Sequence, residues 1–251
     1  MSGNPIAART VARTGIAPSA VAEPGSRFQQ RMSTSYHRFA GSSLDRLAAL
    51  SDGVFAVAMT LLVLDLKAPS VPKRAQQPIW SGGGGSEHPL AHGLLHDVAP
   101  RLLPYLMSFL TLGIFWVGQQ TQLQSFTRSN RALTWIHLTF LLAVTLLPFS
   151  TGLLAQDISY RLSVGVYWLN LLALGVVLYV SLRYAEHAGV ISDETTNEMR
   201  AAMAQRIVVY QTLYALAALT CLINTYLAIG LLFALQVNAV IAPRIWILDR
   251  V

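Results

Sequence analysis

The chain has 251 residues, of which 53% are hydrophobic and only 12% are charged. Soluble domains carry about 25% charged residues, so this sequence lacks the charge needed to cover a soluble fold of its size. The net charge is +6, and the single cysteine, Cys221, excludes an intrachain disulfide and a cysteine-based metal cluster. The basic residues stand at the ends of long apolar blocks, which favours contact with anionic lipid over nucleic acid. The composition therefore predicts an all-α integral membrane protein.

Residues 1–40 contain no apolar block. They mix Gly, Ser, Ala and Pro with scattered Arg, which predicts a disordered cytoplasmic tail without a secretory signal peptide. An organelle transit peptide or a start codon assigned too early would give a similar composition. Residues 41–251 are expected to form one membrane domain.

The apolar stretches of this domain predict six membrane-spanning helices. The first four are expected at about 43–66, 98–119, 130–154 and 162–184. The last apolar block, 207–248, would make a single helix about 63 Å long, twice the hydrocarbon core of about 30 Å. We therefore expect two helices there, joined by a tight turn near Ala228, Ile229 and Gly230.

The distribution of Lys and Arg in the loops predicts the orientation. One side of the membrane collects nine arginines, namely Arg38, Arg46, Arg128, Arg131, Arg183, Arg200, Arg206, Arg244 and Arg250. The other side collects five basic residues, namely Lys67, Lys73, Arg74, Arg101 and Arg161. The side richer in Lys and Arg is cytoplasmic by the positive-inside rule, so both termini are expected in the cytoplasm, with the protein in the cell membrane.

The first predicted helix carries most of the information about function. Asp52 lies inside it, where an acid is costly unless it is paired or hydrated. Two interpretations stay open: Asp52 caps the helix at the headgroup level, or it belongs to a buried polar network. A stripe of small and apolar residues with one hydroxyl also follows one side of this helix, which for a single helix is usually a packing seam. The stripe is Gly53, Val57, Thr60, Leu61 and Leu64.

This segment resembles the prokaryotic members of the transmembrane-protein-175 family, relatives of the lysosomal potassium channel. The hallmark of that family is an Arg, three residues and then Phe-Ser-Asp at the start of the first helix. The matching positions are Arg46, Ser51, Asp52, Gly53, Phe55, Ala56, Thr60, Leu61, Leu62, Leu64 and Asp65. We expect the resemblance to cover residues 40 to 250.

The resemblance implies a potassium-preferring cation channel that conducts passively. It implies a homotetramer in which the first helix of each subunit lines a central pore. Apolar side chains would form the pore constriction at Val57, Leu61 and Leu64, and the hydroxyl of Thr60 would favour potassium. Val57 departs from the family, which usually has Ile at this position. Asp65 would attract cations at the pore mouth, or it is simply an exposed residue that ends the helix.

The second predicted helix shows a further likeness and a departure. The family often has a Trp, two residues and a His there, and the His is thought to bond with the Ser-Asp pair of the first helix. This chain has Trp116 and, in place of the His, Gln119. Glutamine donates and accepts hydrogen bonds but does not titrate, which puts any pH response of that His in doubt. The expected structural network is Arg46, Ser51, Asp52 and Gln119.

Two other classes of membrane protein remain as alternatives. A secondary transporter or proton-coupled carrier would show inverted repeats and broken helices, and the chain has no internal repeat. A membrane enzyme would need converging nucleophiles, acids or histidines. Asp52 and His137 are the strong ionisable candidates inside the spans, and no known motif joins them. We therefore expect neither an enzyme nor a cofactor.

A possible metal site precedes the second helix. His88, His92 and His96 follow a four-residue spacing with Asp97 alongside, which on a helix could bind zinc. Pro89 and the glycine run before it favour an exposed loop, so no metal is expected.

Overall fold

The structure of the protein is a computed structural model that describes residues 44–68 and 88–241. The predicted tail, 1–40, lies outside the described residues. The first helix is Leu44–Leu64, and its last turn tightens into the 3-10 helix η1, Leu62–Asp65. The later helices, in chain order, are α2 (His88–Gly93), the π-helical turn η4 (Leu94–Val98), α3 (Ala99–Gln124), α4 (Arg131–Gln156), α5 (Arg161–His187), α6 (Asn197–Leu219), the 3-10 turn η5 (Thr220–Leu222) and α7 (Thr225–Ile241).

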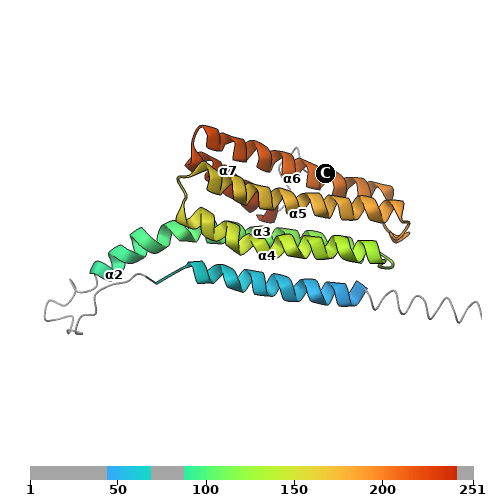
Figure 1. Cartoon of the computed structure of the whole chain (residues 1–251). Helices are drawn as coiled ribbons and strands as arrows, with labels where there is room; N and C mark the ends of the chain where they lie inside the picture. The colour runs from blue at the N-terminus through green and yellow to red at the C-terminus, as the bar shows by residue number, and fades with distance from the viewer. Residues whose placement is uncertain (1–43, 69–87, 242–251) are drawn as a thin grey trace, which may run out of the picture. The chain divides into compact units, whose positions relative to one another are not determined.

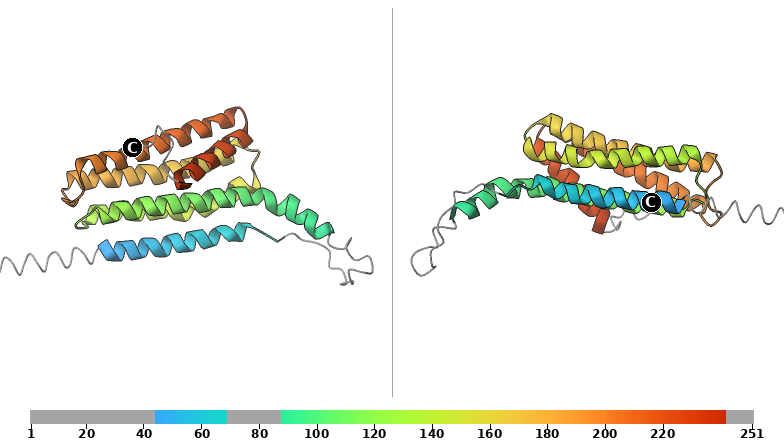
Figure 2. Two further views of the ribbon diagram at one scale, coloured as in Figure 1. Left: turned by 180° about the vertical axis from the view of Figure 1, so that it is seen from behind. Right: turned by 60° about the horizontal axis from the view of Figure 1, so that its bottom comes forward.

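Five of these helices form a closed ring. Each helix from α3 to α7 packs against the next one in the chain, and α7 returns to α3. The first helix lies outside this ring, alongside α3 and α4, as Figures 1 and 2 show. Phe55 of the first helix and Phe115 of α3 both pack against the ring of Phe140 on α4, with centroids 6.1 and 6.3 Å away. These aromatic contacts fix the first helix against the bundle through one face only.

The two ends of the bundle are built differently. At one end, apolar residues from the start of the first helix, the α3–α4 connection and the α5–α6 connection form a small core of their own, which includes Leu47, Phe126 and Val190. The described arginines at this end are Arg46, Arg128, Arg131, Arg183, Arg200 and Arg206. We call it the arginine-rich end. At the opposite end, the α4–α5 connection meets the start of α7, where Ser159 Oγ lies 3.4 Å from Tyr226 Oη.

A single β-bridge joins the two loops at the arginine-rich end. Phe126 pairs with Ile191, and the backbone N–H groups of Thr127 and Ser192 donate to Val190 O and Ser125 O, both at 2.8 Å. Gly189 makes the turn into this bridge with φ +60°, a conformation that favours glycine. The α5–α6 connection is therefore an ordered loop held by backbone hydrogen bonds.

Side-chain caps explain where two of the spans begin. Asn130 Oδ1 accepts from the backbone N–H of Leu133 at 2.8 Å, and Thr196 Oγ1 accepts from that of Met199 at 3.2 Å. Such oxygens satisfy amide groups that have no partner within the helix. The predicted start of the third apolar helix at residue 130 thus coincides with its cap.

The predicted turn near residues 228–230 is wrong. Ala228, Ile229 and Gly230 lie inside α7, and the chain turns at residues 220–224 instead. Asn224 Oδ1 accepts from the backbone N–H groups of Tyr226 and Leu227 at 2.8 and 3.3 Å, which caps α7. Gly230 suggested a turn because glycine is common in turns, but it lies inside α7 with open space beside it.

Four described helices are long and apolar enough to cross a membrane: the first helix, α3, α4 and α5. The first half of α6 is too polar to meet the same criterion, since it carries Glu198, Arg200 and Arg206. The apolar helix α7 has 17 residues, or about 26 Å, slightly less than the hydrocarbon core. The chain is therefore an all-helical multi-pass protein over its described part.

The interior of the ring contains polar groups as well as leucines. Gln236 on α7 donates to Thr111 Oγ1 on α3 and to Tyr167 Oη on α5, at 2.9 and 3.2 Å. Ser108 and Thr151 bond across α3 and α4 at 2.5 Å. All of these side chains are buried. In a bilayer, interhelical hydrogen bonds of this kind help to hold helices together where burial of apolar surface gives no driving force.

Candidate functional site

The first helix has two distinct faces. One face is buried against α3 and α4 and repeats every three or four residues, through Leu47, Ser51, Phe55, Ala58 and Leu62. The other face is apolar yet exposed in the single chain, with Leu50, Val57, Leu61 and Leu64 at 47, 58, 44 and 68% exposure. A helix with an apolar face that no other helix of the subunit covers must meet lipid, another subunit or a pore.

The buried face is attached by a chain of hydrogen bonds through four helices. Gln119 Nε2 on α3 donates to Ser51 Oγ at 3.0 Å and lies 3.4 Å from His137 Nδ1 on α4. His137 Nε2 in turn lies 3.2 Å from Ser181 Oγ on α5. An amide nitrogen can only donate, so Nδ1 accepts and Nε2 carries the hydrogen, which makes the ring neutral. All four side chains are fully buried, and together they fix the height of the first helix against the bundle.

Asp52 is held by a second pair of donors from α3. Trp116 Nε1 and Gln120 Nε2 both donate to Asp52 Oδ1, at 2.8 and 2.7 Å. The carboxylate stays exposed, so it does not carry the cost of a buried charge. Asp52 therefore takes part in interhelical hydrogen bonds with α3, but these are exposed and do not form the buried network that was one of the two interpretations.

Arg46 lies apart from this network. It is exposed, and among the described residues no hydrogen bond or ion pair joins it to Ser51, Asp52 or Gln119. Six residues are about 1.7 turns of helix, so Arg46 and Asp52 point to different sides of the first helix. The structure therefore brings together Ser51 and Gln119, gives Asp52 other partners, and leaves Arg46 outside.

The exposed stripe contains the predicted constriction residues and Thr60. The hydroxyl of Thr60 donates to the carbonyl oxygen of Val57 at 2.8 Å, one turn earlier in the helix. Since its hydrogen is used within the helix, the lone pairs of Oγ1 point outward and are free to accept or to coordinate a cation. Asp65 is the last residue of η1, one residue beyond Leu64.

The histidines before α3 lie on helical turns and not in the predicted loop. His88 begins α2, and the rings of His92 and His96 stack with centroids 4.1 Å apart. Within the described part of the chain, no three metal-ligating side chains converge.

Sequence reasoning missed the partners of Asp52 and of Gln119. Trp116 and Gln120 are four residues apart, which places them on one side of α3, and a Gln beside a Gln in an apolar helix was the available signal. His137 was noted only as a polar residue within a span. Its position opposite Gln119 depends on the packing of α3 against α4, which no local pattern encodes.

Comparison with known proteins agrees with the geometry. Residues 46–148 match the family model described as the endosomal/lysosomal potassium channel TMEM175. A potassium channel of Streptomyces collinus is 32% identical over 166 residues, which are 64% of this chain and 73% of that protein. A potassium channel of Chamaesiphon minutus is 29% identical over 200 residues, or 78% and 93% of the two chains.

A solved structure shares the fold. The crystal structure of a lysosomal potassium-selective channel TMEM175 homolog from Chamaesiphon minutus superposes with a TM-score of 0.65 at 28% identity, covering 80% of this chain and 97% of that one. The matched family segment includes the first helix, its buried partners Gln119 and His137, and the exposed stripe. By sequence and by fold, the chain belongs to the TMEM175 family.

Proposed function

We propose that the protein is a potassium-preferring cation channel of the cell membrane that conducts passively through a homotetrameric pore. The observation that carries the proposal is the exposed apolar face of the first helix, in a chain whose relatives are named potassium channels. The family is one of ion channels and not of enzymes.

The exposed face supplies the side chains that a pore of this kind needs. Four copies of Val57, Leu61 and Leu64 around an axis form apolar rings that close the pore when water leaves it. The Thr60 hydroxyl, with its hydrogen donated to Val57, presents four oxygens that replace part of the hydration shell of a cation. The carboxylate of Asp65, just beyond Leu64, raises the local cation concentration at the mouth.

The hydrogen bonds behind the first helix have a mechanical role in this proposal. A ring of side chains closes a pore only if the four helices stand at the same height. The bonds from Ser51 to Gln119 and from Asp52 to Trp116 and Gln120 set that height from α3. Arg46 is exposed and lies outside this set.

Six spans complete the proposed subunit. Helices α6 and α7 pack on α5 and α3 inside the ring, so they belong at the same membrane depth although neither meets the length and hydropathy of a lone span. The positive first half of α6 lies at the arginine-rich end, which is the cytoplasmic side in this proposal. Both termini then face the cytoplasm.

Ion flux from liposomes tests the pore assignment. We expect potassium-loaded liposomes containing the purified protein to release potassium without valinomycin. The exchange of sodium should be slower than the release of potassium. The substitution Leu61→Asn should raise flux severalfold, because an amide ring keeps the constriction hydrated. Thr60→Ala should lower the preference for potassium over sodium. Leu142→Asn makes the same chemical change on the exposed face of α4 and should alter neither property.

Two outcomes would contradict the proposal. Absence of flux from wild type and from both variants, in oligomers shown to be intact tetramers, would contradict the proposal that the protein is a channel. Flux that saturates and requires a counter-ion would indicate a secondary transporter or proton-coupled carrier in its place.

A further inference from the structure

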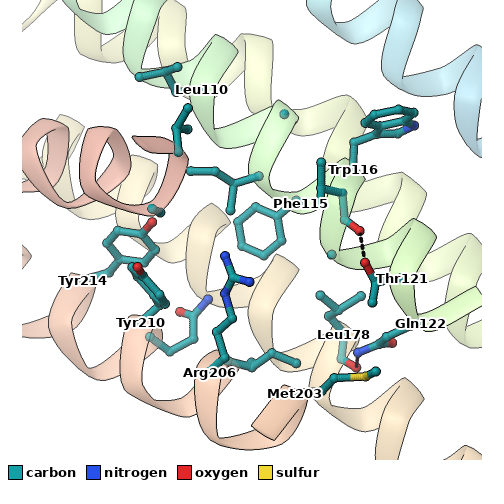
Figure 3. Close-up of a pocket in the computed structure, with 18 of the residues that line it drawn as sticks. Leu110, Phe115, Trp116, Thr121, Gln122, Leu178, Met203, Arg206, Tyr210 and Tyr214 are labelled. Carbon is teal, nitrogen blue, oxygen red and sulfur yellow. Dashed lines mark hydrogen bonds between the residues drawn. The ribbon is translucent and has the colours of Figure 1, made fainter. Parts of the chain in front are cut away.

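A groove lies on the far side of α3 from the first helix. It is bounded by α3, α5, α6 and α7 and has a volume of about 540 Å³. Figure 3 shows its lining, in which aromatic and aliphatic side chains dominate, among them Phe115, Leu178 and Tyr214. None of Val57, Thr60, Leu61 and Leu64 lines the groove, and of the residues that hold the first helix only Trp116, the donor to Asp52, is in the described lining.

The groove has the length of a lipid chain. Its wall on α3 runs from Phe109 to Gln122, fourteen residues or about 20 Å of helix. One leaflet of hydrocarbon is about 15 Å thick, half of the bilayer core. The groove therefore spans one leaflet and reaches the level of the headgroups at its Gln122 end, which is the arginine-rich end of the bundle.

Among the described residues, Arg206 is the one charged residue in the lining. No described acid lines the groove, and the single ion pair in this part of the chain is between Arg183 and Glu186. Figure 3 shows the side chain of Arg206 extending from α6 into the groove. The guanidinium carbon of Arg206 lies 6.0 Å from the centre of the Tyr210 ring. An arginine beside hydrocarbon is costly without an anionic partner.

Several other polar groups of the groove form hydrogen bonds inside the protein. Thr121 donates to Val117 O at 2.8 Å, Gln122 to Leu178 O at 3.1 Å and Gln211 to Leu171 O at 3.0 Å. The Oε1 atoms of Gln122 and Gln211 are buried without a hydrogen-bond partner among the described residues, but an amide oxygen can only accept and does not bind an anion. Arg206 is the charged donor of the described lining. It offers a planar set of donors that fits a phosphate.

We propose that this groove binds an anionic phospholipid, with one acyl chain along α3 and the phosphate on Arg206. Basic pockets between spanning helices on the cytoplasmic side are typical sites for anionic headgroups. A helix of a second subunit is the competing occupant, which the Gly113→Leu variant below distinguishes from lipid.

Lipid binding to the purified oligomer tests the site without any measurement of flux. Native mass spectrometry would compare dioleoyl phosphatidylglycerol, dioleoyl phosphatidylcholine and inorganic phosphate. We expect phosphatidylglycerol to bind about tenfold more tightly than phosphatidylcholine, the effect of one charge-assisted contact. Phosphate alone should not displace it, because the chain supplies most of the contact area.

Two substitutions distinguish the contribution of the Arg206 charge from that of the contacts with the acyl chain. Arg206→Gln should abolish the preference for phosphatidylglycerol and leave binding of phosphatidylcholine unchanged. Gly113→Leu should weaken both lipids, since Gly113 lines the groove and has open space beside it for a larger side chain. The matched controls are Arg131→Gln, an exposed arginine of the same end, and Gly165→Leu, a helical glycine with open space elsewhere. Both controls should bind as wild type does.

Four results would overturn the proposal. Equal binding of the two lipids by wild type would show that the charge selects nothing. A preference that survives Arg206→Gln would place the anionic lipid elsewhere, and displacement by inorganic phosphate would make the ligand a soluble anion. Dissociation of the oligomer by Gly113→Leu, with the lipid preference intact, would show that a neighbouring subunit fills the groove.

Discussion

The amide of Gln119 links the first helix to the rest of the subunit. Its nitrogen meets Ser51 on one side and His137 on the other, and all three side chains are buried. In the family resemblance a histidine stands at this position. Here the imidazole comes from α4 instead, one hydrogen bond further from the first helix. Ser51 is therefore connected to an imidazole through Gln119, and this imidazole belongs to His137 on α4.

Removal of the Gln119 amide should destabilise the protein. In Gln119→Leu, Ser51 and His137 each lose a partner inside the membrane, and we expect the free energy of unfolding to fall by about 1–2 kcal/mol. Denaturation of the purified protein in mixed micelles measures this change. Gln205→Leu on the exposed surface of α6 is the control and should change the stability little. A fall of equal size in the control would mean that the amide of Gln119 contributes nothing specific.

At the scale of helices, the contact between α5 and α6 depends on the absence of a side chain. A Cβ on Gly175 would lie 1.8 Å from Nε2 of Gln211, the nitrogen that donates to Leu171 O. Glycine thus makes room for an interhelical hydrogen bond. This glycine lies in the middle of α5, where the usual cost of glycine in a helix is offset by the close approach that it allows.

Gly175→Ala should lower the melting temperature of the protein, because α5 and α6 must separate or Gln211 must give up its bond. Gly165→Ala in the same helix meets open space and should leave the melting temperature unchanged or raise it slightly. The double variant Gly175→Ala/Gln211→Ala should recover part of the loss, since the clash is gone. Thermal unfolding followed by circular dichroism would test all three, and an unperturbed Gly175→Ala protein would contradict the packing described here.

The bounds of the helices could be predicted from the sequence where polar residues separate two apolar blocks. They could not be predicted where one apolar block is continuous. The spans expected at 130–154 and 162–184 agree with α4 and α5 because caps and loops separate them. The second span was predicted to end at Gln119, whereas α3 continues to Gln124, since the amide nitrogens of Gln119, Gln120 and Gln122 donate hydrogen bonds within the bundle. The turn at Asn224 was not predicted because it lies within a continuous apolar block. Partners across helices, such as His137 for Gln119, follow from packing and not from local sequence.

At the scale of the whole molecule, the two ends of the bundle differ in charge and in construction. The arginine-rich end contains the bridged loops 125–130 and 188–196, and the other end contains the short connections 157–160 and 220–224. The positive-inside rule assigns the arginine-rich end to the cytoplasm. This assignment determines which mouth of the proposed pore carries Asp65.

Labelling of single cysteines in intact cells tests the orientation. In a Cys221→Ala background, Ser159→Cys should react with a membrane-impermeant maleimide, and Glu194→Cys should react only after permeabilisation. Both positions are exposed in the loops at opposite ends of the bundle, so accessibility to the reagent within the protein is matched. The reverse pattern would place the termini outside the cytoplasm and the Asp65 mouth inside.

The β-bridge between Phe126 and Ile191 has a practical consequence for imaging. It couples the loop that leaves α3 to the loop that enters α6, so a rigid binding protein attached at Asp193 and Glu194 would follow the motion of both. An antibody fragment directed to this loop would therefore act as a fixed fiducial for aligning images of a small membrane particle. The same fragment, bound to this loop in each subunit, would report the symmetry of the assembly directly.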